Sequence, residues 1–498
     1  MIDKRSSGIL LHVSSLSGPD GIGDLGLDAY RWIDFLAESK CAIWQTLPLG
    51  PTGFGNSPYQ SFSAFAGNPN LISLQKLCDQ NLITEDDLSI RPQFNQFKVD
   101  YQKVNEWKQN ILSLAFENYK SRSNNITRNL YDKFFEDNKY WIEDFGLFLA
   151  LKEFHNGHPW NMWKYSLKKR ELSALNEFRS QLSHEIEFHI FQQFIFFNQW
   201  DSLHQYANQC GIKILGDLPI FIAMDSVDTW SSPDLFLLDE NDQPLYVAGV
   251  PPDYFSDTGQ LWGNPLYQWN NHIESNFHWW LDRIKFTLKQ FDLLRIDHFR
   301  GFCANWQIPA GMPTAEIGEW SPGPGSRFFD TLMTTLGDLP FIAEDLGDIT
   351  LDVVELRERY NLPGMKILQF AFSNGSSNPF LPHNYPVLCV AYTGTHDNDT
   401  SLGWFENSTN QERCHFTEYT NSNHEDVSWD MIRAIWASVA QVAIAPLQDF
   451  LSLNSEARMN YPGTKSNNWA WRVDANQIDT KLTERVKKIN TLYGRAIL

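Results

Sequence analysis

Short apolar runs that end in small or polar residues, each followed by a stretch with helical periodicity, recur along this chain. Such alternation is typical of βα units, which build parallel sheets. Eight runs fit the eight strands of a (β/α)8 TIM barrel, the fifth being the shortest: residues 9–16, 42–49, 213–221, 293–299, 306–308, 341–346, 365–372 and 387–393. We therefore predict the α/β class, with residues 1–498 as a single barrel, a length that barrels with insertions reach.

Two intervals are too long to be simple connections between these strands. More than 160 residues separate the second run from the third, and residues 70–200 within this gap are polar, charged and helical in period. Structureless loops of that length are uncommon in compact domains, so we predict a helical insertion subdomain there. A second insertion, residues 223–271, carries Pro, Gly and aromatic residues in GVPPDYFSDTGQLWGNPLYQW and is predicted to form a lid over one face of the barrel.

The longest apolar stretch near the C-terminus, residues 432–447, contains Arg433 and Gln441 and is shorter than a membrane span. We therefore predict a buried helix there and no membrane partner. The chain ends soon after the last expected barrel helix, so we expect no separate C-terminal β-sandwich domain.

Composition limits the partners of this chain. It has 60 acidic and 40 basic residues, a formal charge of −20, whereas nucleic-acid affinity depends on Lys and Arg. It also has 19 Trp, 17 Tyr and 35 Phe, and flat rings suit core packing or stacking on sugar faces. We expect a neutral partner and no nucleic acid.

The N-terminus and the cysteines bear on the compartment. The first residues, MIDKRSSGILLHVSSL, carry no readable secretory signal. The six cysteines form no CxxC pair and no short spacing typical of a disulfide framework or a metal clamp: Cys41, Cys78, Cys210, Cys303, Cys389 and Cys414. We expect free thiols in a reducing cytoplasm, so the localisation that we predict is cytoplasmic.

Two other motifs suggest different chemistry. Residues 21–26 read GxGxxG, but the dinucleotide fingerprint also needs an acidic residue at the end of the second strand, and residues 41–78 contain no Asp or Glu. His184, Glu185 and His189 read HExxxH, and this spacing puts the two imidazoles on different helix faces, unlike a zinc HExxH pair. We therefore expect no nucleotide cofactor and no metal.

Three acidic residues follow the ends of predicted strands: Asp297 in LLRIDHFRG, Glu344 in FIAEDLGD and Asp397 in YTGTHDND. Barrel active sites form at the carboxyl ends of the strands, from residues on several of them. A lone acid there is more often a helix cap, but these acids have polar neighbours that suit sugar hydroxyls, since His298 follows Asp297 and His396 precedes Asp397. We predict that the three carboxylates meet in one catalytic site.

The surroundings of two of these acids predict different protonation states. Arg295 lies two residues before Asp297, so both side chains point to one side of the strand, and the arginine charge should lower the Asp297 pKa. Glu344 ends an apolar run, where burial should raise its pKa. Retaining glycosidic transfer uses such a pair, an ionised nucleophile and a protonated acid, about 5 Å apart.

The motifs LLRIDH, AED and GTHD resemble characteristic regions of the α-amylase clan. Segments across nearly the whole chain resemble one branch of it, the 4-α-glucanotransferases called amylomaltases or disproportionating enzymes: GILLHVSSLSGPDGIGDLG, WQTLPLGPTGFGNSPYQSFSAFAGNP, GDLPIFI, GVPPDYFSDTGQLWGNPLY, GPGSRFF, LPHN and RMNYPGTKSNNWAWR. The resemblance implies Asp297 as nucleophile, Glu344 as general acid/base, and Asp397 as the carboxylate that grips ring hydroxyls and favours the distorted transition state.

The substrate-binding residues expected from the motifs and the resemblance are Tyr59, Asp217, Arg295, His298, His396, Phe255, Gln260 and Trp262. The resemblance implies that Tyr59 stacks on the sugar beside the nucleophile and that the loop around Trp262 covers the acceptor side. Phe54 stands where family members often carry a Tyr at a second glucan site, so we expect no hydroxyl-dependent contact there.

The resemblance implies a retaining 4-α-glucanotransferase. A segment of a 1,4-α-glucan would pass to the 4-hydroxyl of an acceptor glucan or glucose through a covalent glucosyl-enzyme, with cycloamylose formation as a variant. The expected partners are malto-oligosaccharides, amylose and glycogen-type glucans, and the mechanism demands no cofactor. The main alternative function is a hydrolase that uses the same carboxylates. The remaining alternative is a protein of another class, either a non-catalytic glucan-binding protein or a nucleotide oxidoreductase. Glucan length and oligomeric state stay open.

Overall fold

Eight parallel strands form the barrel in the part of the chain that the computed structural model describes, residues 4–122, 125–252, 256–464 and 467–497. The strands are β1 (Ser6–Leu10), β2 (Ile43–Gln45), β3 (Lys213–Pro219), β6 (Leu293–Asp297), β9 (Phe341–Ala343), β10 (Gly364–Ile367), β11 (Cys389–Tyr392) and β12 (Val442–Pro446). They pair in the order β10-β11-β12-β1-β2-β3-β6-β9, and Ala343 N donates to Pro363 O at 2.9 Å across the remaining gap. The predicted α/β class and (β/α)8 barrel are confirmed.

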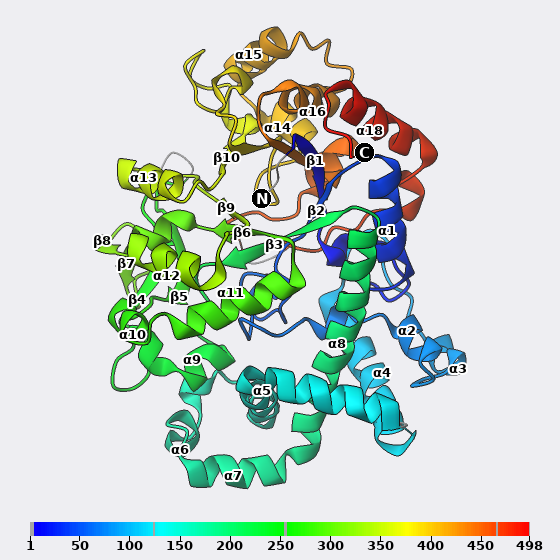
Figure 1. The fold of residues 1–498 in the computed structure, drawn as a ribbon, viewed down its shortest axis with the longest axis vertical. Helices are drawn as coiled ribbons and strands as arrows, with labels where there is room; N and C mark the ends of the chain where they lie inside the picture. The colour runs from blue at the N-terminus through cyan, green and yellow to red at the C-terminus, as the bar shows by residue number, and fades with distance from the viewer. Residues whose placement is uncertain (1–3, 123–124, 253–255, 465–466, 498) are drawn as a thin grey trace.

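A second sheet, with four antiparallel strands in the order β5-β4-β7-β8, lies beside the barrel (Figure 1). Its strands are β4 (Tyr246–Val250), β5 (Gln260–Pro265), β7 (Ala304–Pro309) and β8 (Glu319–Pro322). Residues 306–308 belong to β7, so the prediction that they form a barrel strand is wrong. Ile308 is buried while Gln307 beside it is half-buried, an alternation typical of a sheet with one solvated face rather than of a barrel strand.

The eighth barrel strand, β12, lies in the apolar stretch 432–447, for which the sequence predicts a helix. Only the start of that stretch is helical, because α16 (Val427–Ala437) ends before Ser438 and the chain then enters β12. All residues of β12 are buried. A short apolar run has the same composition in a buried strand and a buried helix, so periodicity alone does not separate the two, and the prediction is wrong.

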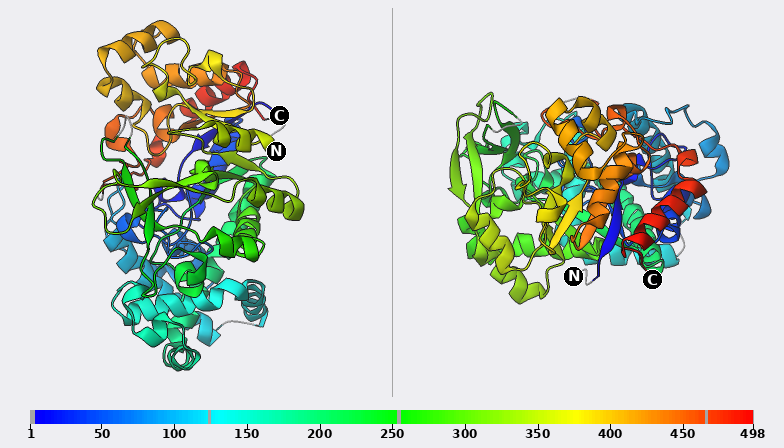
Figure 2. Two further views of the ribbon diagram at one scale, coloured as in Figure 1. Left: turned by 90° about the vertical axis from the view of Figure 1, so that its left-hand side faces the viewer. Right: turned by 90° about the horizontal axis from the view of Figure 1, so that it is seen from above.

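The long interval between β2 and β3 is helical. Its helices are α2 (Leu74–Asp79), α3 (Glu85–Ser89), α4 (Tyr101–Arg122), α5 (Asn125–Phe154), α6 (Tyr165–Lys168), α7 (Leu172–Gln181) and α8 (Ser183–Gln209). Helices α5, α6 and α7 lie together at one end of the molecule, and α8 runs from there back to the barrel (Figures 1 and 2). Trp200 of α8 contacts Trp44 of β2, with 6.5 Å between ring centroids. The segment 70–200 is therefore tied to the barrel through α8.

The interval 223–271 holds α9 (Val227–Ser231), β4, β5 and α10 (Trp269–Glu274). Strand β4 pairs with β5 on one side and with β7 on the other, so this insertion shares a sheet with the segment after β6. Residues 253–255 in the middle of the interval lie outside the described residues.

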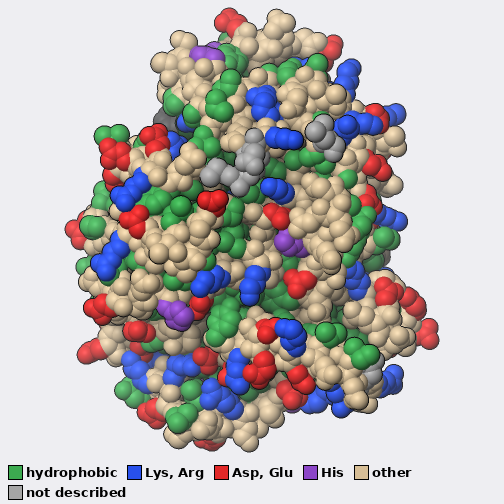
Figure 3. All heavy atoms as spheres, in the orientation of Figure 1, with side chains coloured by type: hydrophobic (Ala, Val, Ile, Leu, Met, Phe, Trp, Pro, Cys, Tyr) green, Lys and Arg blue, Asp and Glu red, His purple; other side chains and the backbone are tan. Residues whose placement is uncertain are grey.

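The remaining helices are α1 (Leu27–Glu38), α11 (His278–Gln290), α12 (Ser326–Leu336), α13 (Leu351–Arg359), α14 (Ser401–Asn407), α15 (Asn410–Thr420), α17 (Leu447–Phe450) and α18 (Thr480–Leu492). Acidic and basic side chains are interspersed over the face drawn in Figure 3. Among the described helices, none combines the length and apolar character that crossing a membrane requires.

Packing explains a glycine of the GxGxxG motif. A Cβ atom on Gly23 would lie 2.0 Å from the carbonyl oxygen of Val13, so only glycine fits this close approach. The dinucleotide fold needs an open, doubly wound sheet, whereas β1 here pairs with β2 and β12 inside a barrel. The glycine motif therefore allows the close packing of the loop that connects β1 to α1.

The C-terminal segment binds to the end of the barrel at which the parallel strands begin. Arg495, just beyond α18, is fully buried. Its guanidinium donates to the carbonyl oxygens of Trp436 at 2.9 Å, Ser6 at 3.0 Å and Ala440 at 2.9 Å. One side chain thus joins the end of α16 to the starts of β1 and β12.

Replacing Arg495 by Met should lower the free energy of unfolding by about 3 kcal/mol, because the substitution leaves several buried carbonyls without a donor. Lys487→Met is the matched control, since Lys487 lies on α18, is 40% exposed and pairs only with Glu484 in the described structure. The control should change stability by less than about 1 kcal/mol. Denaturant unfolding of the full chain measures both, and equal effects would contradict the role of Arg495.

Candidate active site

Parallel pairing brings the predicted polar residues to one end of the barrel. In the register of β3 and β6, Asp217 is opposite Arg295 and Pro219 is opposite Asp297. Glu344 directly follows β9, and its backbone N donates to Ile296 O of β6 at 3.1 Å. The sequence places Asp297 and Glu344 far apart, and the parallel strands bring them to neighbouring positions.

Arg295 lies at the centre of the charged groups. Its Nη1 donates to both carboxylate oxygens of Asp217 at 2.8 Å and to Oδ1 of Asp297 at 2.8 Å. Arg295 is 4% exposed and Asp217 is 3% exposed, whereas the Asp297 side chain remains 28% exposed. The guanidinium therefore orients a carboxylate that a substrate can still reach.

The pKa of Asp297 differs from the expected direction. Burial raises it to about 6, and Asp217 adds to the rise, while Arg295 lowers it by less. The prediction of a lowered pKa is wrong because burial outweighs the charge of Arg295, which also pairs with Asp217.

Glu344 has the expected raised pKa. Burial and the neighbouring Asp297 raise it to about 7, against the lowering effects of Arg295 and two backbone donors. Those donors are His298 N, at 2.6 Å from Oε2, and Leu346 N, at 2.9 Å from Oε1. The two carboxyl groups are thus electrostatically coupled, and Glu344 holds its proton to higher pH than Asp297 does.

Asp397 has the opposite environment. Burial raises its pKa, but the neighbouring His396 and a hydrogen bond from Asn460 outweigh burial and bring the pKa to about 2. His396 Nε2 lies 3.3 Å from Asp397 Oδ2, and Asp397 in turn raises the pKa of His396 against the effect of burial. Asp397 is therefore a permanently charged acceptor at neutral pH.

Tyr59 connects the two sides of the site. Its hydroxyl donates to Asp217 Oδ2 at 2.7 Å and lies 2.9 Å from His396 Nε2. Its ring stacks on the imidazole of His396, with centroids 5.2 Å apart and planes at 17°, and it also contacts Trp469. The hydroxyl and the stacked ring together fix the position of the tyrosine.

His298, whose backbone N donates to Glu344, has a left-handed backbone conformation, with φ 51°. Such strain in a non-glycine residue persists where the surroundings enforce it, often at functional sites. The ring is 8% exposed, burial lowers its pKa to about 3, and Nε2 has no hydrogen-bond partner in the described structure. The edge of Trp262 meets it at 4.8 Å between centroids, and Trp262 Nε1 donates to Gln260 Oε1 at 3.2 Å.

Two predicted positions cannot be placed. Phe255 falls within 253–255, outside the described residues, and the side chain of Phe54 is not described either. Arg295 is surrounded by six of the other predicted residues: Tyr59, Asp217, Asp297, Glu344, His396 and Asp397. His298 bonds to Glu344, Trp262 contacts His298, and Gln260 bonds to Trp262.

The sequence analysis missed residues near the C-terminus. Asn460 Nδ2 donates to Asp397 Oδ1 at 2.6 Å, and Arg458 Nη2 donates to the Asp397 carbonyl at 2.6 Å. Trp469 packs on both Tyr59 and His396. All three lie in the segment RMNYPGTKSNNWAWR, which the resemblance includes without a role for any single residue.

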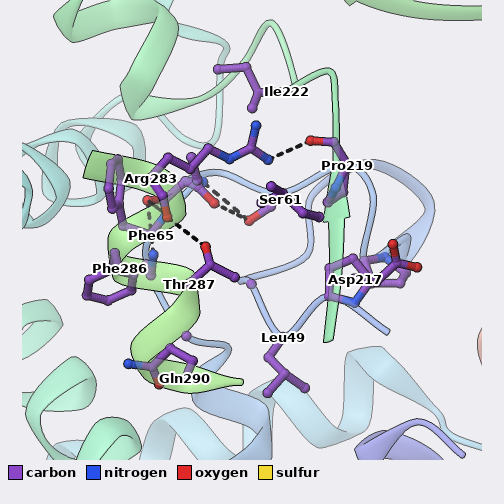
Figure 4. Close-up of a pocket in the computed structure, with 18 of the residues that line it drawn as sticks. Leu49, Ser61, Phe65, Asp217, Pro219, Ile222, Arg283, Phe286, Thr287 and Gln290 are labelled. Carbon is purple, nitrogen blue, oxygen red and sulfur yellow. Dashed lines mark hydrogen bonds between the residues drawn. The ribbon is translucent and has the colours of Figure 1, made fainter. Parts of the chain in front are cut away.

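A cavity of about 90 Å³ lies behind the site, between the loop after β2, the end of β3 and helices α8 and α11. Figure 4 shows Phe65, Phe286 and Thr287 on one side of it and Asp217 on the other. Asp297, Glu344 and Asp397 do not line it, and pockets for small molecules usually enclose roughly 300–1,000 Å³. We therefore do not assign the substrate to this cavity.

Known proteins resemble this chain over nearly its whole length. The family model described as 4-alpha-glucanotransferase matches residues 11–477. The 4-alpha-glucanotransferase of Thermus thermophilus is 50% identical over 477 residues, covering 94% of this chain and 95% of the relative. That of Synechocystis sp. is 47% identical and covers 100% of this chain and 99% of the relative.

A solved structure shows the same fold in detail. The amylomaltase from Streptococcus agalactiae, in complex with acarbose, superposes with a TM-score of 0.97 at 41% identity, covering 99% of this chain and 100% of that one. Together with the family match, this agreement confirms the family that the sequence motifs indicate, and the chain belongs to the 4-alpha-glucanotransferase family of enzymes.

Proposed function

We propose that this 4-alpha-glucanotransferase works by double displacement with retention of configuration. The observation that carries the proposal is the pair of coupled carboxyl groups, Asp297 held by Arg295 and Glu344 with the higher pKa. This difference fits an ionised nucleophile beside a protonated acid.

In the first step, an Asp297 oxygen attacks the anomeric carbon of the donor while Glu344 gives its proton to the departing glycosidic oxygen. The bond between the two sugars breaks, and a covalent glucosyl-enzyme forms on Asp297. In the second step, the 4-hydroxyl of an acceptor attacks the anomeric carbon, Glu344 takes the hydroxyl proton, and Asp297 leaves as a carboxylate.

The residues around the two carboxyl groups orient the nucleophile and bind the sugar whose bond is cleaved. Arg295 and Asp217 orient the nucleophile, and the ionised Asp397 accepts hydrogen bonds from ring hydroxyls, most strongly in the distorted transition state. The neutral His298, whose Nε2 has no partner in the described structure, offers a hydrogen bond to the donor or acceptor sugar.

The acceptor decides between transfer and hydrolysis, because both share the covalent intermediate. Trp262 lies against His298 and offers an aromatic surface that can receive a sugar and displace water. When the acceptor is the far end of the same donor chain, the second step closes a ring, which is the cycloamylose reaction.

Malto-oligosaccharides, amylose or glycogen-type glucans and glucose are the proposed substrates and acceptors. The amylomaltase from Streptococcus agalactiae, in complex with acarbose, supports an oligosaccharide site in this fold. All six cysteines are free thiols, which fits the proposed cytoplasmic location.

Incubation with maltotriose should give glucose and longer oligomers while the total number of reducing ends stays constant. Each transfer breaks one glycosidic bond and forms another, so the number of reducing ends does not change, whereas hydrolysis creates one new reducing end for each bond that it breaks. Chromatography of the products with a reducing-sugar assay measures both quantities. A steady rise in reducing ends would support the alternative, a hydrolase with the same carboxylates.

Replacing Asp297 or Glu344 by Ala should reduce turnover of maltotriose by about 10⁴-fold or more. With α-maltosyl fluoride and azide, E344A should form α-maltosyl azide, since the covalent intermediate still forms, whereas D297A should form the β-azide. Asp352→Asn, at an exposed position of α13, is the control and should keep parental activity. Identical azide products from both variants would exclude these role assignments.

The pH dependence of kcat/KM for maltotriose should be a narrow bell. Activity rises as pH increases through about 6, where Asp297 loses its proton, and falls through about 7, where Glu344 loses the proton it must donate. Fluoride leaves without a proton, so the alkaline limb should disappear with α-maltosyl fluoride. An alkaline limb that persists unchanged with the fluoride would contradict the assignment of Glu344.

A further inference from the structure

Asp449 is a buried carboxylate outside the group that surrounds the proposed nucleophile. It lies in α17, directly after β12, and is 0% exposed. Its Oδ2 accepts from Thr393 Oγ1 at 2.5 Å and from Ser401 Oγ at 2.8 Å, and its Oδ1 accepts from Ser401 N at 2.7 Å. The Asp449 carboxylate therefore accepts hydrogen bonds from both Thr393 and Ser401, which lie at the two ends of a short loop.

That loop carries two residues of the site. Thr393 directly follows β11, and Ser401 is the first residue of α14. Between them, His396 contacts Tyr59, and Asp397 is the charged acceptor described above. Asp449 thus holds both ends of the segment that presents Asp397 to the site.

Hydrogen bonds within the segment and from Gln369, which follows β10, also hold it. Asn398 Oδ1 accepts from both the backbone N and the hydroxyl of Thr395 at 2.9 Å, and Gln369 Nε2 donates to the Asp399 carbonyl at 2.8 Å. These bonds shape residues 394–400 between the two ends that Asp449 holds, while Asn460 and Arg458 contact Asp397 directly.

Burying a charge costs free energy unless donors or a cation compensate for it. In the described structure no Lys, Arg or His side chain forms an ion pair with Asp449, so its three hydrogen-bond donors supply the compensation. Burial raises its pKa, which is about 6 even though these three donors act to lower it. Thr393 and Ser401 are themselves fully buried, which excludes water as a substitute acceptor.

We propose that Asp449 is a positioning residue for catalysis, which acts by fixing both ends of the segment 393–401 so that Asp397 meets the sugar in the transition state. This inference rests on the proposed role of Asp397. It extends that role, because it says that Asp449, a fully buried side chain that the substrate does not contact, sets the position of Asp397.

The variants that test it are D449A, D449N and T393V. D449A removes all three acceptor contacts and should lower kcat by about 100-fold while KM changes by less than about threefold, since misplacement by about 1 Å can have that effect. D449N keeps an oxygen for Ser401 N and should recover kcat to within about tenfold of the parent. T393V removes one hydroxyl and should lower kcat by about fivefold.

Asp292 provides the matched structural control. Its Oδ2 accepts from Ile214 N at 2.7 Å and from His204 Nε2 at 3.1 Å, at the opposite end of the barrel. D292A should lower the melting temperature but leave kcat within about twofold of the parent. Inhibition by acarbose, whose half-chair ring imitates a distorted sugar, should weaken in D449A and not in D292A.

The outcomes separate the two proposals. If D397N keeps full activity, the proposed role of Asp397 fails; if D397N is impaired while D449A and T393V keep parental kcat, only the role of Asp449 fails. Equal losses of kcat in D449A and D292A also overturn it, because they indicate general destabilisation. If D449A does not fold, T393V decides: a lowered kcat at unchanged melting temperature supports the inference, and an unchanged kcat overturns it.

Discussion

The guanidinium of Arg295 is the interaction on which the site depends. It is almost completely buried and donates to two carboxylates on adjacent strands, Asp217 on β3 and Asp297 on β6. An arginine stays charged under these conditions, and its planar donors fix the direction of the groups they bind. The strand register that sets Asp217 opposite Arg295 is thus also what aims the proposed nucleophile.

Different neighbours give the three carboxyl groups of this site different pKa values, although burial acts to raise all three. For Asp297, burial outweighs the charge of Arg295, and the nearby Asp217, which pairs with the same cation, raises the pKa further. Glu344 has backbone donors instead of a direct ion pair and keeps its proton to higher pH. Asp397 has a histidine and an amide beside it and stays ionised far below neutral pH. Three acids of similar chemistry therefore reach three different protonation behaviours.

Elements from both ends of the chain hold the third carboxylate in place. Asn460 and Arg458 bind Asp397 from the C-terminal segment, and Tyr59 and Trp469 enclose the ring of His396. Asp449 of α17, just after β12, joins the two ends of the loop that carries Asp397. The placement of Asp397 is therefore a property of the closed barrel, in which β12 lies between β11 and β1.

The sequence alone determined the barrel class, the family and the three acids that follow the strands. Each acid belongs to a short motif whose own residues are neighbours in the chain, so the motif can be recognised without the fold. It did not separate the strand β12 from a buried helix, nor the strand β7 from a barrel strand, since short apolar runs look alike in both settings. The tertiary structure decided which charges share a partner. Asp217 and Asp449 act on residues distant in sequence, so only the folded barrel shows why the Asp297 pKa rises and what fixes the loop of Asp397.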